Sequence, residues 1–318
     1  MMNPAPPAIG VDFGGTSIKI GVAAADRILE KAAPLPTPAY DSPQAIIDAM
    51  CATIRSLLSR YPEAQAVGLG MPGWVDFSRG VLYQLTNVPV WSTQVPVREI
   101  MQAELGLPVV LDNDANAMAY AEWKLGAGRG LQSLVCLTLG TGIGGGIVVH
   151  DRMLRGRHIS AAELGQTSIS FNGRVGPFGN RGAIEEYLGN NEVAADAARL
   201  YAEAGSPRPV SECTPKHLEA AARAGDPIAM SIYDSFAEKL ACLIMNMMYT
   251  LVPEAFIIGG GVAKAGDLLF APLEAQLRAQ LFPVHAQGLR LLPAHFGADS
   301  GLIGAALMAA DYARGVLR

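Results

Sequence analysis

The sequence has little positive charge and few cysteines. Lysine and arginine total 24 against 29 acidic residues, so the net charge of -5 at pH 7 argues against a nucleic-acid-binding protein, which would carry a basic stripe. None of the four cysteines belongs to a C-x-x-C pair, and their spacings suggest no disulfide framework: Cys51, Cys136, Cys213 and Cys242. We therefore expect buried thiols in a reducing compartment.

Long apolar runs are also missing. The first residues, MMNPAPPAIG, include neither the basic segment nor the apolar segment of a signal peptide. The most apolar helical stretch, residues 242–252, is too short to cross a bilayer, which takes about 20 residues. These absences predict a cytoplasmic protein with no membrane partner and no nucleic-acid partner.

Apolar residues and glycine are abundant. Half of the 318 residues are apolar, which allows a substantial core in one large domain or two medium ones. An apolar strand, a glycine turn and a second strand occur at residues 8–20 and again at 134–149. Two copies of one unit predict two related halves that face each other.

The remaining elements follow from apolar spacing. Residues 43–60 have helical spacing, with Ser42 as the expected N-cap and Pro43 in the first turn. The other expected helices are 115–125, 185–205, 215–224, 227–250 and 301–318. Short apolar runs predict strands at 66–71, 109–111 and 255–258.

Three glycine turns each follow an apolar strand. They read D-F-G-G-T at 12–16, G-T-G-I-G-G-G at 140–146 and G-G-G at 259–261. Glycine lets the backbone approach a phosphate and direct N–H groups at its oxygens. None of the turns fits the P-loop or the Rossmann pattern. Together they predict a phosphate site of another type.

Polar residues accompany the first turn. Asp12 could hold Mg²⁺ beside a nucleotide, or could bond to its own loop. Thr16 and Lys19 follow at a spacing that could bring a hydroxyl and an ammonium near the same phosphates. Lys19 could equally lie on a solvated strand face.

Asn113 and Asp114 lie between a predicted strand and a predicted helix. Asp114 has two interpretations at this point, a helix N-cap or a general base that takes the proton of an attacking hydroxyl. As a base it would have Asn113 beside it to hold a neighbouring sugar hydroxyl. The residues alone do not choose between the two.

Two acids, Glu163 and Glu185, stand in glycine-rich surroundings of low charge. Carboxylates accept hydroxyl hydrogen bonds, so they suit a polyol, although both could be ordinary exposed acids. His158 is isolated, and we expect a structural or solvent-facing histidine rather than a ligand.

Taken together, these segments resemble the ROK family of sugar kinases and sugar-responsive repressors, over nearly the whole chain. The similar segments are D-F-G-G-T-S-I-K at 12–19, M-P-G-W-V-D at 71–76, T-N-V-P-V-W at 86–91, D-N-D-A-N-A-M-A-Y-A-E at 112–122, G-T-G-I-G-G-G-I-V at 140–148 and I-I-G-G-G-V at 257–262.

The resemblance implies an α/β protein with the actin-like ATPase (ribonuclease H-like) fold, in which two α/β domains enclose a cleft. We expect a small domain at 1–118, with the C-terminal helix 301–318 packed back on it, and a large domain at 119–300. Relatives often form oligomers, so a homodimer is expected.

The resemblance further implies an ATP- and Mg²⁺-dependent sugar kinase with Asp114 as the catalytic base and Asp12 on the metal side. The matching sugar-side positions are Gly73, Asn87, Asn113, Glu163, Gln166 and Glu185. The matching ATP-side positions are Asp12, Gly14, Gly15, Thr16, Lys19, Gly140, Thr141, Gly142, Gly260 and Gly261.

One segment departs from the family pattern. The family usually holds a structural zinc with one histidine and three cysteines, and those positions are Gln166, Gly176, Phe178 and Ala183 here. Phenylalanine and alanine cannot bind zinc, so we expect a zinc-free loop. Gln166 replaces a histidine that contacts the sugar in relatives, which leaves the preference around that hydroxyl open.

Several alternatives remain. Glucose is the expected acceptor, with fructose, mannose and N-acetylhexosamines open, and polyphosphate is an alternative donor. A sugar-sensing repressor is disfavoured because only 11 residues precede Asp12, too few for a helix-turn-helix module. An ATPase of the actin or chaperone type is disfavoured by the acids and by Asn87.

Overall fold

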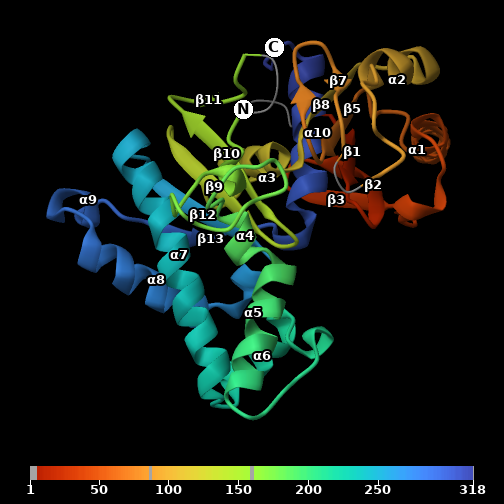
Figure 1. Ribbon diagram of the computed structural model, residues 1–318. Helices are drawn as coiled ribbons and strands as arrows, with labels where there is room; N and C mark the ends of the chain where they lie inside the picture. Colours follow the sequence, from red (N-terminus) through yellow and green to blue (C-terminus); the bar gives the residue numbers. More distant parts are fainter. Residues whose placement is uncertain (1–5, 86–87, 158–160, 318) are drawn as a thin grey trace.

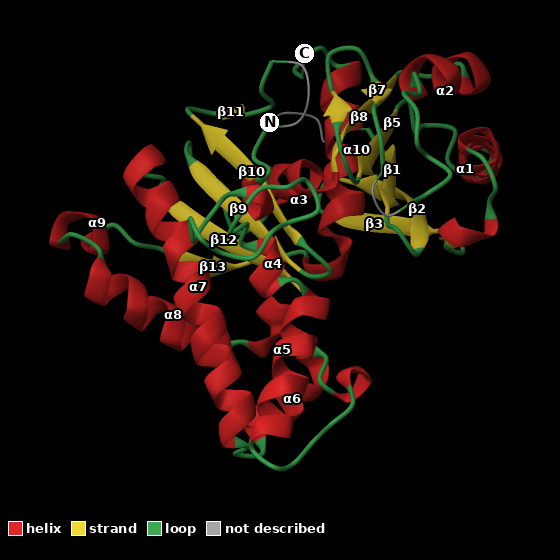
Figure 2. Ribbon diagram, viewed as in Figure 1, coloured by secondary structure: helices red, strands yellow, loops and turns green. Residues whose placement is uncertain are grey.

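Two mixed β-sheets, each covered by helices, form the two halves of the molecule (Figures 1 and 2). The computed structural model describes residues 6–85, 88–157 and 161–317. Helices α3 (Asp114–Lys124) and α10 (Ser300–Ala313) lie between the sheets in Figure 1.

The first sheet has the strand order β3-β2-β1-β5-β8, with β4 paired to β2. Its strands are β1 (Ala8–Phe13), β2 (Ser17–Ala24), β3 (Arg27–Lys31), β4 (Leu35–Pro36), β5 (Val67–Met71) and β8 (Val109–Asn113). Strands β1, β5 and β8 are parallel, so their carboxyl ends meet at one edge. That edge therefore brings together the first glycine turn and Asn113.

The predicted first helix is confirmed. Helix α1 (Pro43–Leu58) begins at Pro43, and the Ser42 side chain accepts a hydrogen bond from the Ala45 amide. Helix α1 lies against β2 and against α2 (Val97–Leu105), and the small hairpin β6 (Val75–Asp76) and β7 (Val81–Leu82) completes this half. The sequence had not indicated α2, which is only nine residues long and mixes apolar with charged and polar residues.

The second sheet repeats the plan of the first, with the order β11-β10-β9-β12-β13. Its strands are β9 (Leu134–Leu139), β10 (Ile143–Val149), β11 (Arg152–Met153), β12 (Ala255–Gly260) and β13 (Leu291–Pro293). Strand β9 pairs antiparallel with β10 across a glycine turn and parallel with β12, as β1 pairs with β2 and β5. The predicted repeat of strand, glycine turn and strand is confirmed.

Helices of the second half pack beside this sheet (Figure 1). They are α4 (Glu185–Leu188), α5 (Asn190–Glu203), α6 (Pro215–Arg223), α7 (Pro227–Leu251), α8 (Asp267–Gln280) and α9 (Pro283–Gln287). All of them except α9 contribute buried side chains to one core. Short 3₁₀ helices occur at Thr37–Ala39, Leu164–Gln166, Val210–Glu212, Val262–Ala265 and Gly297–Asp299. Over the described ranges, no helix has the length and apolar character needed to cross a membrane.

The backbone of α10 lies unusually close to its neighbours. A Cβ atom added at Gly10 would lie 2.1 Å from the Leu302 carbonyl oxygen, and one added at Gly68 would lie 1.9 Å from the Ala305 carbonyl oxygen. At Gly304 it would lie 1.7 Å from the Ala117 carbonyl oxygen of α3. Glycine at these positions lets α10 pack on β1, β5 and α3 together. The domain boundary at residue 118 stays a prediction.

Replacing Gly304 with alanine would place a methyl group against the Ala117 carbonyl. We expect the free energy of unfolding to fall by about 1–3 kcal/mol in urea titrations, because overpacking forces the backbone to shift. Gly288→Ala is the control, since a Cβ there has its nearest neighbour at 3.8 Å and the position is exposed. The control should stay within about 0.5 kcal/mol. Equal stabilities of the two variants would contradict the close packing.

Candidate functional site

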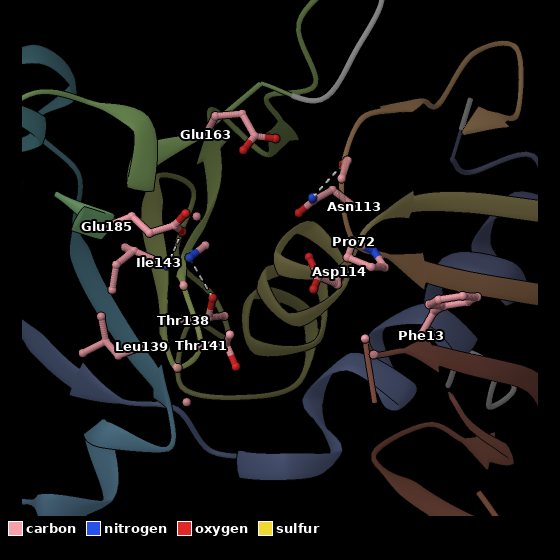
Figure 3. Close-up of a pocket in the computed structure, with 18 of the residues that line it drawn as sticks. Phe13, Pro72, Asn113, Asp114, Thr138, Leu139, Thr141, Ile143, Glu163 and Glu185 are labelled. Carbon is pink, nitrogen blue, oxygen red and sulfur yellow. Dashed lines mark hydrogen bonds between the residues drawn. The ribbon is translucent and has the colours of Figure 1, made fainter. Parts of the chain in front are cut away.

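A cavity of about 550 Å³ lies where the glycine turns of the two sheets face each other, beside the start of α3 (Figure 3). The predicted residues that line it are Gly14, Gly15, Thr16, Gly73, Asn113, Asp114, Gly140, Thr141, Gly142, Glu163, Glu185 and Gly260. The predicted residues that do not line it are Asp12, Lys19, Gln166 and Gly261. Asn87 and His158 lie outside the described residues.

Asp114 is the first residue of α3 and not its N-cap. The cap is Asn113, whose Oδ1 accepts hydrogen bonds from the amides of Ala115 at 2.9 Å and Asn116 at 3.4 Å. The carboxamide Nδ2 of Asn113 donates to the Gly73 carbonyl at 3.3 Å. Because Asn113 caps the helix, the Asp114 carboxylate is placed on the cavity wall, as Figure 3 shows.

The surroundings of Asp114 favour its protonated form more than water does. Burial raises the pKa of Asp114 to about 6, the negative charge of Asp12 adds to the effect, and the Ala115 amide opposes it. A carboxylate with such a pKa is ionised at pH 7 and still able to accept a proton.

A buried carboxylate holds the strand end that precedes Asp114. Asp112 is 1% exposed, and its Oδ1 accepts hydrogen bonds from the Asn113 amide at 2.8 Å and from Asn116 Nδ2 at 2.9 Å. Its Oδ2 accepts one from Arg155 Nε at 2.6 Å. Arg155 comes from the loop after β11, and its guanidinium lies 4.0 Å from the centre of the Phe77 ring. This cluster therefore links the second half of the molecule to the β8–α3 junction.

The glycine turns present backbone and hydroxyl groups to the cavity. Thr138 Oγ1 accepts a hydrogen bond from the Gly144 amide at 3.1 Å, which holds the β9–β10 turn. Gly260 has a φ of +90°, and a Cβ there would lie 2.2 Å from the Leu139 carbonyl oxygen. Only glycine suits that position, so the strand can end against the neighbouring turn.

Two further acids share the cavity with Asp114. Glu185, at the start of α4, accepts hydrogen bonds from the Ile143 amide at 2.8 Å and from Gln166 Nε2 at 3.1 Å. Burial raises the pKa of Glu163 to about 7, and the charges of Asp114 and Glu185 add to the effect. Three carboxyl groups in one cavity suit a ligand that donates hydrogen bonds, such as a sugar.

Asp12 and Lys19 pair with each other beside the cavity. The Lys19 ammonium lies 2.8 Å from Asp12 Oδ2, and β1 and β2 place the two residues opposite each other. The Lys19 side chain is 41% exposed. Lys19 thus contacts Asp12 and solvent, not the cavity wall.

Gly261 lies at a second cavity of about 520 Å³ beyond the end of β12. Its other walls come from Asn190, Thr214, Pro215, Lys216, Glu219, Tyr233, Val262 and Lys264. Since Gly260 lines the first cavity and Gly261 the second, the glycine turn after β12 adjoins both.

The four positions that hold zinc in the family do not fit a zinc ion here. Gly176 has no side chain, Ala183 is fully buried, and the Phe178 ring lies 5.7 Å from that of Trp74. Gln166 alone has a polar side chain, and zinc prefers thiolate, imidazole and carboxylate ligands. In the described part of the chain, no three His, Cys, Asp or Glu residues group as a metal site.

Several lining residues were not singled out from the sequence. They are Phe13, Pro72, Thr138, Leu139, Ile143, Gly144, Gly145 and Ala162. Five of them lie inside the quoted motifs, so those motifs were a usable signal: Phe13, Pro72, Ile143, Gly144 and Gly145. Sequence reasoning missed Arg155 entirely, because nothing in the sequence around Arg155 indicates that it pairs with Asp112.

Comparisons with known proteins agree on one family. A sequence model described as the ROK family matches residues 8–312. The chain is 35% identical to a glucokinase of Thermotoga maritima over 94% of this chain and 95% of that protein. It is 34% identical to a glucokinase of Streptomyces coelicolor over 95% and 97% of the two chains.

A solved structure gives the same picture. The chain is similar to a ROK family glucokinase from Streptomyces griseus in complex with glucose and AMPPNP, with a TM-score of 0.81 and 32% identity. The match covers 95% of this chain and 99% of that one. It confirms the predicted fold class, the actin-like ATPase fold with two α/β domains.

Removing the cation beside Asp112 should destabilise the protein. Arg155→Met keeps an apolar stem but leaves a buried carboxylate without its partner, so we expect the free energy of unfolding to fall by about 3–5 kcal/mol. Combining it with Asp112→Asn removes both charges and should recover a large part of that loss. Urea unfolding of both single variants and the double variant gives the coupling energy. Additive effects would show that the two residues do not interact.

Proposed function

The chain belongs to the ROK family, and from this we propose that it is a sugar kinase that transfers the terminal phosphoryl group of ATP to glucose. The observation that carries the proposal is the position of Asp114. It lines one cavity together with the glycine turns of both sheets and with the acids Glu163 and Glu185. The likeness to glucokinases over nearly the full chain supports glucose as the acceptor.

We assign the sugar to the acidic part of the cavity. Asn113, Glu163 and Glu185 offer hydrogen-bond acceptors and a carboxamide there, and Gly73 leaves room beside Asn113. Asn87 belongs to the same proposed set by its place in the sequence. Gln166 does not line the cavity but donates a hydrogen bond to Glu185, which does.

We assign the nucleotide to the glycine turns. Gly14, Gly15 and Thr16 face Gly140, Thr141 and Gly142 across the cavity, so N–H groups from both sheets can reach the phosphates. Gly260 and Gly261 lead to the second cavity, where Lys216, Lys264 and Asn190 offer contacts for the nucleoside. In this proposal the sugar and phosphates occupy the first cavity and the nucleoside occupies the second.

Chemistry follows from the place of Asp114. Its carboxylate takes the proton of the attacking sugar hydroxyl while the new O–P bond forms and the bond to the leaving ADP breaks. The turn amides stabilise the charge on the phosphoryl oxygens. Closure of the two domains over the cavity would exclude water as a competing acceptor.

Asp12 suits a Mg²⁺ site on the phosphate side. Its Oδ2 is paired with Lys19, and its carboxylate is close enough to Asp114 to raise the pKa of that residue. A carboxylate that binds the ion directly or through water fits the preference of Mg²⁺ for oxygen ligands. When bound, the ion supplies charge neutralisation for the phosphates. The expected homodimer and cytoplasmic location stay predictions.

Asp114→Asn should lower kcat by roughly 10²–10⁴-fold, the usual contribution of a general base, while glucose still binds. Asp48→Asn, an exposed acid on α1, is the matched control and should keep full activity. Because the base works in its deprotonated form, the parent kcat/KM for glucose, which reports the free enzyme, should decline as pH falls through about 6. Steady-state kinetics and calorimetry check both points. Near-normal turnover of Asp114→Asn would remove Asp114 from the role.

A phosphorylation panel tests the overall function. Glucose, fructose, mannose and N-acetylhexosamines are each offered with ATP or with polyphosphate, and sugar phosphate is quantified. We expect the highest kcat/KM for glucose with ATP. A clear preference for another hexose or for polyphosphate would correct the substrate assignment, and no transfer from either donor would refute the kinase proposal.

A further inference from the structure

Side-chain amides hold Glu185 where the family pattern places a metal-bound loop. Gln166 Nε2 donates to Glu185 Oε1 at 3.1 Å. Asn180 Nδ2 in turn donates to Gln166 Oε1 at 3.3 Å and to the Gln166 carbonyl at 3.2 Å. Residues 166, 180 and 185 are therefore joined by hydrogen bonds that end on an acid of the cavity.

The direction of these hydrogen bonds is fixed by charge. An ionised carboxylate only accepts, so Gln166 must turn its NH₂ group towards Glu185. The carbonyl oxygen of Gln166 then faces Asn180, which must donate a hydrogen bond to it from its own NH₂ group. One negative charge thus orients both amides.

Nearby residues make room for this arrangement and brace it. A Cβ at Gly176 would lie 2.6 Å from Asn180 Oδ1, so the residue that replaces a family cysteine leaves space for the Asn180 side chain. The Gly176 amide also donates to the Asn180 carbonyl at 2.8 Å. Arg174 binds both carboxylate oxygens of Asp196 at 2.8 Å, which fastens the loop to α5.

Glu185 is held on both oxygens as a result. Gln166 occupies one lone pair of Oε1, and the Ile143 amide occupies one lone pair of Oε2 at 2.8 Å. Each oxygen keeps a second lone pair that a ligand can use, since Glu185 lines the cavity. Without the Gln166 donor, the carboxylate could turn about the single Ile143 contact.

We propose that Gln166 and Asn180 are positioning residues, which orient the Glu185 carboxylate for sugar through two side-chain amides and without a metal ion. This amide relay, residues Asn180, Gln166 and Glu185, rests on the proposed function of the cavity as a sugar site. Neither amide residue lines the cavity, so each acts on the sugar only through Glu185.

Isosteric changes that replace a donor with an acceptor test the relay. Asn180→Asp and Gln166→Glu keep shape but place a carboxylate against an acceptor. Both should weaken glucose binding about tenfold at pH 8, the scale of one hydrogen bond to a charged group, measured by calorimetry without ATP. Asn172→Asp makes the same change at an exposed position of the same loop and should bind as the parent does.

Lower pH should rescue Gln166→Glu, whose new carboxyl group faces the Glu185 carboxylate and has its pKa raised by that charge. A protonated carboxyl group donates a hydrogen bond as an amide does, so the affinity ratio of this variant to the parent should return towards one as pH falls from 8 to 5.5. A loss caused only by damaged folding would persist at low pH. Such persistence would overturn the relay, as would variants that bind glucose within twofold of Asn172→Asp at pH 8.

The effect of metal ions on glucose affinity tests the relay separately. Dialysis of the parent protein against a chelator should leave glucose affinity unchanged, and added zinc should leave it unchanged too. A loss on chelation that zinc restores would overturn the relay. A parent protein that binds no glucose at all would instead refute the proposed function, so the two failures are distinguishable.

Discussion

The hydrogen bonds to the buried Asp112 carboxylate are the interactions on which the geometry of the cleft depends. The carboxylate accepts hydrogen bonds from its own strand end, from α3 and from Arg155 in the other half of the chain. Such a charge is stable in a dry interior only with partners for its oxygens, so the surrounding groups are forced into one arrangement. Asn113 and Asp114 follow directly, and their positions are fixed by that arrangement.

Electrostatics in the cavity favours function over stability. Burial raises the pKa values of Asp114 and Glu163; the charge of Asp12 adds to the effect on Asp114, and the charges of Asp114 and Glu185 add to the effect on Glu163. Carboxylates gathered in this way cost stability in the empty protein and become useful when hydroxyl donors arrive. A proton acceptor beside acids that can accept hydroxyl hydrogen bonds is the arrangement that the proposed sugar kinase requires.

Side-chain and backbone contacts cross-link the loop between Gln166 and Glu185. Backbone bonds, the Arg174–Asp196 pair and the amide contacts of Asn180 and Gln166 provide the cross-links. The Phe178 ring also contacts Trp74 from the β5–β6 connection, which links the loop to the first half. These contacts are individually weak, but they are made between groups already held by the chain.

The sequence by itself determined the features that depend only on residues close together in the chain. The helix that begins at Pro43, the two strand–turn–strand units and the family motifs could be identified because capping, glycine turns and apolar spacing act over a few positions. Tertiary structure decided which residues meet. Arg155 reaches Asp112 across 43 positions, and Asn113 rather than Asp114 caps α3. Such choices depend on burial and partner geometry, which exist only once the sheets and helices have packed.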